Sequence, residues 1–269
     1  MRYFFISDVH GEFDDMMKAL NDAGFNKEQD TIVSLGDLTD RGPKSKEVVE
    51  FVVKCPHRIL LWGNHEVWFR QIICGSRFFG DHDRQNGVLD TMKSFDKEYD
   101  GNLWDSIERL QSNHLLQYYF SQCHYAVRWS HLIGTHAWLP IGTEGVLGLD
   151  FADPRDWHDA IWAETAKIIK DPANFPDRKI IVGHWHAWRL RPGSEVFKYY
   201  SQIPEIDFST YETDKFIAID GCTNISHKVN VYVMKTDEEP EIIDAVPYNV
   251  VAERIKKERM KNLLDKEQN

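Results

Sequence analysis

Residues 31–42 read Thr31-Ile32-Val33-Ser34-Leu35-Gly36-Asp37-Leu38-Thr39-Asp40-Arg41-Gly42, an apolar run that passes directly into a polar segment between two glycines. The apolar part predicts a strand, and the glycines suit tight turns beside functional groups. The same change from apolar strand to polar turn recurs three times, at Asp8-Val9-His10-Gly11, at Gly63-Asn64-His65-Glu66 and at Gly183-His184-Trp185-His186. The sequence thus repeats one pattern, a predicted short strand followed by polar side chains.

The order of the predicted elements indicates an α/β fold. Apolar runs predict strands at 3–7, 31–35, 59–62, 125–129, 132–135, 179–182, 216–219 and 229–234. Helical periodicity occurs at 13–23, 46–53, 87–99, 103–110 and 157–169, and in a charged C-terminal helix within 248–269. The alternation in the first half predicts parallel strands with helices outside, and the closely spaced later strands predict antiparallel additions.

Length and composition are those of one folded domain spanning residues 1–269. Residues 75–113 could form a helical cap or lid; the alternative is plain helical packing beside the sheet. No apolar stretch is long enough to cross a bilayer, and the four cysteines form no C-x-x-C pair, so a cytoplasmic protein is expected. The net charge of -11 argues against general affinity for nucleic acid.

The four motifs predict a metal centre. Each is weak alone, because polar residues after a strand are ordinary turn chemistry. Together they bring carboxylate, imidazole and amide groups to strand ends, which meet at one edge of an open α/β sheet. His136, after the apolar run 132–135, adds an imidazole. Mixed nitrogen and oxygen ligands suit a pair of borderline divalent ions.

At these residues the sequence resembles the calcineurin-like metallophosphoesterase superfamily. The motif at 36–42 followed by Gly63-Asn64-His65-Glu66 is most similar to the phosphoprotein-phosphatase branch, which includes bacterial and phage Ser/Thr phosphatases and symmetrical dinucleoside tetraphosphatases. The resemblance extends from Asp8 to His186 and implies a central β-sandwich of two mixed sheets flanked by helices in four layers.

The resemblance also implies a ligand set for two divalent ions, with manganese expected and iron, zinc or nickel as alternatives. Asp8 and His10 would bind the first ion and Asp37 would bridge both; the second would be held by Asn64, His136 and His184. His186 departs from the phosphatase branch. In the wider superfamily a second histidine at this place binds the first ion, and the alternative is a pocket histidine.

Catalytic roles follow from the same resemblance. His65 would be the general acid for the leaving group, Asp40 would orient it, and Arg41 would grip the phosphate. A second arginine that the family often places in a Trp-x-Arg segment is replaced here, because Trp162-Ala163-Glu164 ends in glutamate. Its substitute could be any of Arg128, Arg155, Arg189 or Arg191.

The function expected is a phosphomonoesterase of the Ser/Thr protein phosphatase type, acting through a hydroxide held between the two metals. The alternatives are a hydrolase of dinucleoside polyphosphates or other nucleotides, a superfamily nuclease, and a protein that only binds phosphate ligands on this fold. The expected partner is therefore a phosphoprotein or a nucleotide-type small molecule, with no membrane. Trp138, Trp185 and Trp188 could line a pocket for an aromatic group, or belong to the core.

Overall fold

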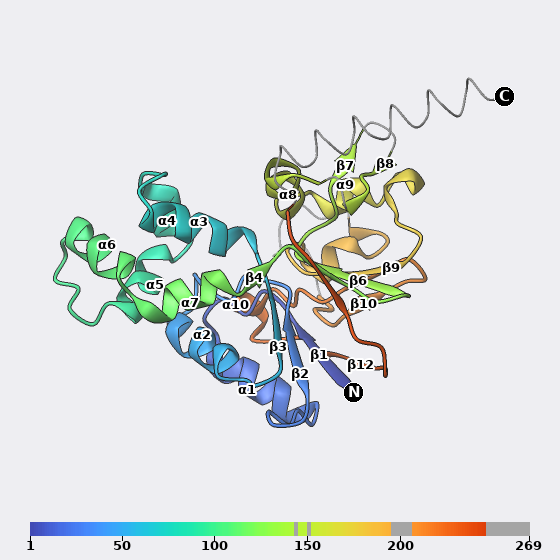
Figure 1. Cartoon of the computed structure of the whole chain (residues 1–269), viewed down its shortest axis with the longest axis horizontal. Coiled ribbons are helices and arrows are strands. Elements are labelled where there is room, and N and C mark those ends of the chain that lie inside the picture. The colour runs from blue at the N-terminus through green and yellow to red at the C-terminus, as the bar shows by residue number, and fades with distance from the viewer. Residues whose placement is uncertain (143–144, 150–151, 195–205, 246–269) are drawn as a thin grey trace, which may run out of the picture.

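The computed structural model describes residues 1–142, 145–149, 152–194 and 206–245 (Figure 1). The helix expected within 248–269 lies outside these residues.

The described chain contains two mixed sheets. The first has the strand order β12-β1-β2-β3-β4, with β1 to β4 parallel and β12 antiparallel at the edge. Its strands are Arg2–Ile6 (β1), Thr31–Ser34 (β2), Arg58–Leu61 (β3), Cys123–His124 (β4) and Tyr232–Lys235 (β12). The second has the order β10-β11-β9-β6-β5-β13, formed by Tyr211–Glu212 (β10), Phe216–Ala218 (β11), Lys179–Val182 (β9), Leu132–Thr135 (β6), Ala126–Arg128 (β5) and Glu241–Ile243 (β13). A small hairpin joins Ile141–Gly142 (β7) and Gly145–Val146 (β8).

Helices cover the outer face of each sheet. Those beside the first sheet are Phe13–Asp22 (α1), Ser45–Val53 (α2), Asn64–Ile73 (α3), Asp81–Gln85 (α4), Val88–Phe95 (α5), Leu103–Gln111 (α6) and His114–Ser121 (α7) (Figure 1). The second sheet is covered by Pro154–Ile161 (α8) and Thr165–Ile168 (α9), with 3-10 turns at Pro172–Asn174 and Ala187–Leu190. Thr223–Ser226 (α10) follows β11.

Three hydrophobic clusters hold the layers together. Tyr3, Phe5 and Val33 of the first sheet meet Val127 and Ile181 of the second in the middle of the sandwich. A second cluster joins the first sheet to α1, α2, α3, α5, α6 and α7, and a third lies under α8 and α9. The predicted sandwich of two mixed sheets flanked by helices is confirmed.

Besides the helix expected at 87–99, which ends at Phe95 (α5), two predicted elements differ from the structure. The helix expected at 157–169 is two helices: α8 begins earlier because Asp153 caps it and Pro154 occupies its first turn, and the chain breaks between Ile161 and Thr165. The strand expected from Val229 begins only at Tyr232. Periodicity located both regions but did not predict their boundaries.

Residues 75–113 are mainly helical and share the hydrophobic cluster of the first sheet. Val88, Met92 and Phe95 of α5 and Ile107 and Leu110 of α6 are all buried in it. α5 packs on α2, and α6 packs on α3. This segment therefore contributes to the core as well as lying near the strand ends.

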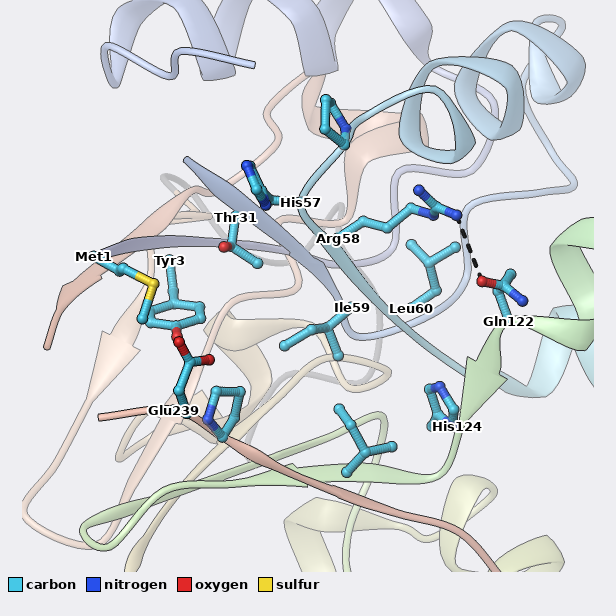
Figure 2. Close-up of a pocket in the computed structure, with 13 residues that line it drawn as sticks. Met1, Tyr3, Thr31, His57, Arg58, Ile59, Leu60, Gln122, His124 and Glu239 are labelled. Atoms are coloured by element: carbon cyan, nitrogen blue, oxygen red, sulfur yellow. Dashed lines mark hydrogen bonds between the residues drawn. The ribbon is translucent and has the colours of Figure 1, made fainter. Parts of the chain in front are cut away.

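A pocket of about 540 Å³ lies at the end of the first sheet where the parallel strands begin (Figure 2). Figure 2 shows Arg58 reaching toward Gln122, with Met1 and Tyr3 at the other side of the pocket. The predicted ligands follow the opposite ends of these strands, so this pocket is separate from them. Among the described residues, no helix has the length and apolar character required to span a membrane.

Candidate metal centre

Backbone hydrogen bonds join the motif loops into one unit. The Asp8 N–H donates to Gly36 O at 3.1 Å, and the His10 N–H donates to Asp37 O at 3.0 Å. On the second sheet the Gly183 N–H donates to His136 O at 2.7 Å. The His184 N–H also donates to Asp8 Oδ2 and so joins the two sheets, which brings the polar residues after β1, β2, β6 and β9 together at one edge of the sandwich.

Backbone strain is concentrated in these loops. Among the described residues, eight non-glycine residues have positive φ, and six of them belong to the predicted site: Asp8, His10, Asp37, Asp40, Arg41 and His184. Such conformations cost free energy and persist only where surrounding contacts impose them. Gly63 shows how tightly the loops pack, because a Cβ there would lie 2.2 Å from Asp37 Oδ1.

Glu66 supplies several of the contacts that impose this loop conformation. Its buried carboxylate accepts hydrogen bonds from the backbone N–H groups of Asp37 at 2.7 Å and Leu38 at 2.9 Å. It also accepts from the Thr39 N–H at 3.3 Å and the Gly63 N–H at 3.1 Å. Glu66 thus does more than orient the helix that begins at its own motif: it fixes the position of Asp37.

Asp37 belongs to two separate groups of side chains that could hold a cation. The first group is His10, Asp37 and His65, and the second is Asp37, His136 and His184. Asp37 Oδ2 lies 3.8 Å from His10 Nε2, whereas Oδ1 lies 3.4 Å from His136 Nε2. Asn64 Oδ1 faces the second group, 2.9 Å from His136 Nε2 and 2.8 Å from His184 Nδ1. One carboxylate between two groups is the arrangement that a bridging ligand requires.

The histidine rings are oriented for coordination. His10 Nδ1 lies 2.8 Å from Thr39 O, and His136 Nδ1 lies 2.8 Å from Leu35 O, so in each ring this nitrogen can donate to a carbonyl. When the rings are neutral, their Nε2 atoms then keep the free lone pairs that ligating histidines require. His10 Nε2 is buried and has no hydrogen-bond partner. These donors fit a divalent cation.

Burial and charge keep most of these ligands in the protonation state that binds metal. Burial holds the pKa of His10 well below its usual range, and it lowers the pKa of His184 to about 3. Burial alone would raise the pKa of Asp37, but the charges of His136 and His65 outweigh it and hold that pKa well below its ordinary value. His136 and Asp8 are exceptions. The Asp37 carboxylate overcomes burial and raises the pKa of His136 to about 9, and burial raises the pKa of Asp8 to about 7. Cation binding at His136 would therefore displace a proton.

Asp8 and His186 lie beside these groups but, in the described part of the chain, belong to neither. Asp8 Oδ2 accepts hydrogen bonds from Ser7 Oγ at 2.5 Å and from the His184 N–H at 2.9 Å. Burial lowers the pKa of His186 to about 4, which leaves its imidazole neutral. His186 Nε2 lies 4.0 Å from Oδ2 of the buried Asp220. Asp220 is not among the ligands predicted from the sequence.

A second constellation joins His65, Asp40 and Arg41. His65 Nδ1 lies 2.8 Å from Asp40 Oδ2, and Arg41 Nη2 lies 3.3 Å from His65 Nε2. Burial would lower the pKa of His65, but the charges of Asp37 and Asp40 outweigh it and raise that pKa. Thr91 supports Asp40 from α5: its hydroxyl donates to Asp40 Oδ1 at 2.8 Å and accepts from the Asp40 N–H at 2.9 Å.

We expect Thr91→Val to lower the free energy of unfolding by about 1–3 kcal/mol, because it leaves the buried Asp40 N–H and one carboxylate oxygen without a partner. Thr91→Ser keeps the hydroxyl and should lose much less. Urea unfolding monitored by circular dichroism measures the difference. Equal stability of Thr91→Val and wild type would show that this contact does not hold Asp40.

The three tryptophans next to the ligand motifs are buried to different extents. Trp138 is fully buried and its Nε1–H donates to Asn174 O at 3.0 Å, so of the two alternatives it belongs to the core. Trp188 is also buried, and Trp185 packs against the cluster under α8 and α9. Trp68, one turn after His65 on α3, lies 5.8 Å from the His65 ring and contacts Trp162.

Two curated relatives match short parts of the chain. A symmetrical bis(5′-nucleosyl)-tetraphosphatase of Neisseria gonorrhoeae is 34% identical over 76 residues, 28% of each chain. One of Vibrio cholerae is 35% identical over 92 residues, 34% of each chain. The matches therefore span about a third or less of these relatives' length.

Solved structures share the fold over nearly the whole chain. A cold-active protein-tyrosine phosphatase of a psychrophilic Shewanella species has a TM-score of 0.51 at 15% identity, covering 90% of this chain and 80% of that one. A structure described as a putative diadenosine tetraphosphatase has a TM-score of 0.50 at 15% identity, covering 90% and 93%. The family model for calcineurin-like phosphoesterases matches residues 1–211, which include every residue of the centre except Asp220. The chain belongs to the calcineurin-like phosphoesterase family.

Proposed function

We propose that this protein is a phosphoric ester hydrolase that uses two divalent cations, with manganese as the first choice. The position of Asp37 between two groups of histidines carries the proposal. His10 would hold the first cation with Asp8 and, in this proposal, His186; His136, His184 and Asn64 would hold the second. When bound, such a pair supplies a nucleophile at neutral pH and neutralises the charge of the phosphate oxygens.

The residues beside the cations would bind the phosphate and protonate the leaving group. Arg41 offers a guanidinium fork that matches two phosphate oxygens. Its Nη2 is 3.3 Å from His65 Nε2, so one phosphate can contact both side chains. His65 would then donate a proton from Nε2 to the leaving oxygen, while Asp40 holds Nδ1 and fixes the ring orientation.

Arg189 is our choice for the missing second arginine, because it follows His186 by three residues in the same turn. Burial is the main cause of the lowered pKa of His186, and the charge of Arg189 lowers that pKa further. Glu164, at the expected arginine position, pairs instead with Lys167.

The proposed reaction is cleavage of a phosphomonoester, as in the Ser/Thr protein phosphatases. A second candidate is hydrolysis of dinucleoside polyphosphates, favoured by the sequence matches to symmetrical tetraphosphatases. Both use the same cations and the same acid. A protein that only binds phosphate ligands is disfavoured, because every predicted ligand position keeps a donor side chain.

Removal and return of metal tests this proposal. We expect chelated protein to lose hydrolysis of p-nitrophenyl phosphate and to recover it with Mn²⁺, because no step can proceed without the cations. Calorimetric titration of the chelated protein with Mn²⁺ should show binding independently of turnover. Metal binding without hydrolysis of any phosphate ester would favour the phosphate-binding alternative, and full activity after verified metal removal would contradict the proposal.

A further inference from the structure

An aromatic cluster begins beside the proposed general acid. His65 and Trp68 are three residues apart on α3 and therefore share one face of the helix. Their ring centroids lie 5.8 Å apart with an edge-to-face orientation. Because His65 would protonate the leaving group, this cluster lies on the leaving-group side of the reaction.

Trp68 is the centre of the cluster and is itself largely covered. Its ring contacts His82 of α4 at 4.6 Å, Trp162 at 5.5 Å and the guanidinium of Arg77 at 4.3 Å. Trp68 is only 8% exposed, whereas Trp162 is 37% exposed and His82 is also exposed. Trp68 therefore supports two rings that remain available to a ligand.

The cluster is fixed to the loop that carries Arg41. α4, which carries His82, leads into Asn86, whose carbonyl accepts a hydrogen bond from the Arg41 N–H at 3.0 Å. A Cβ on the next residue, Gly87, would lie 2.4 Å from Arg41 N, so the two segments pack in direct contact. Trp162 approaches from the other side of the sandwich, at the end of α8. The position of His82 is thus set relative to Arg41.

We propose that Trp162 and His82 form a subsite for the nucleobase of a nucleotide substrate. Bases stack on aromatic side chains whatever their sequence, since every base has a π-face. Trp68 lies between Trp162 and His65 in this chain of ring contacts, and in a nucleoside monophosphate the sugar likewise lies between the leaving oxygen and the base. The ring of an aryl phosphate, in contrast, is bonded directly to that oxygen. This inference rests on the proposed hydrolase function and specifies its substrate.

The test compares substrates with and without a base. The first pair is adenosine 5′-monophosphate and ribose 5-phosphate, which lacks only the base; the second is diadenosine tetraphosphate and inorganic tetraphosphate, which lacks both nucleosides. For at least one pair, wild type should prefer the nucleotide by about tenfold or more in kcat/KM, the scale of one base–aromatic contact. Trp162→Ala should remove most of that preference, chiefly through KM, and Trp162→Phe should retain it. His82→Ala should reduce it in part.

Trp104→Ala is the matched control, because Trp104 is a tryptophan on α6 that is 67% exposed and outside the cluster. It should leave the nucleotide preference unchanged. If wild type hydrolyses p-nitrophenyl phosphate but shows no preference for nucleotides, the nucleobase subsite is contradicted and the proposed hydrolase function is not. A Trp162→Ala defect confined to p-nitrophenyl phosphate would also contradict the nucleobase subsite, because it would indicate an aryl site. Hydrolysis of no phosphate ester by the metal-loaded protein would instead contradict the proposed function.

Discussion

His65→Ala is expected to keep both metal ions and to lose roughly 10²–10⁴-fold in kcat on an alkyl phosphate, the usual range for loss of a general acid. The reason is geometric. His65 Nδ1 is held by Asp40 at 2.8 Å, so the Nε2 edge faces Arg41 and would face a phosphate bound there. An alkoxide leaves poorly without a proton from that position.

The loss should depend on the leaving group. p-Nitrophenolate leaves as a stable anion, so His65→Ala should be impaired much less on p-nitrophenyl phosphate. Asp40→Asn should show the same pattern more mildly, because it misorients the ring without removing it. His57→Ala, at an exposed histidine at the beginning of β3, is the matched control and should change neither rate.

Metal content separates this role from coordination. His65 Nε2 lies 3.9 Å from Asp37 Oδ2 and shares a group with His10, so the geometry also allows it to bind the first cation. If His65→Ala loses a metal ion, His65 is a ligand and not only a general acid. If its kcat falls by the same factor on alkyl phosphates and on p-nitrophenyl phosphate, His65 is not the general acid.

The sequence predicted those site residues that directly follow a strand along the chain. Asp8, Asp37 and Asn64 each follow a strand, and parallel strands bring such positions to one edge. The contacts among Asp37, His136 and His184 agree with that expectation. Residues adjacent to a recognisable strand can therefore be placed without knowing the tertiary packing.

The supporting residues could not be found in this way. Thr91 contacts Asp40, although the two residues are 51 positions apart in the sequence. Asp220 lies in a turn whose residue types are those of any ordinary turn, so its proximity to His186 could not be predicted. Trp68 and Trp162 meet only because α3 and the end of α8 approach each other from opposite sides of the sandwich. Such contacts leave no periodic signal, since they depend on how the layers pack.

Asp37→Asn is expected to cause the largest loss in the molecule. The substitution removes the charge and one of the two oxygens that face separate histidine groups, at 3.8 Å from His10 and 3.4 Å from His136. An amide cannot bind two cations through two oxygens. Because a bound cation contributes several kcal/mol of charge stabilisation, kcat should fall by about 10³-fold or more.

The metal content of Asp37→Asn tests the central claim most directly. Wild type loaded with Mn²⁺ and passed through a desalting column should contain two ions per chain, and Asp37→Asn should contain at most one. Asp96→Asn is the matched control: Asp96 is also a buried carboxylate, but it pairs with Arg109, and its substitution should leave two ions bound. One ion per chain in wild type, or an unchanged two in Asp37→Asn, would contradict a binuclear centre bridged by Asp37.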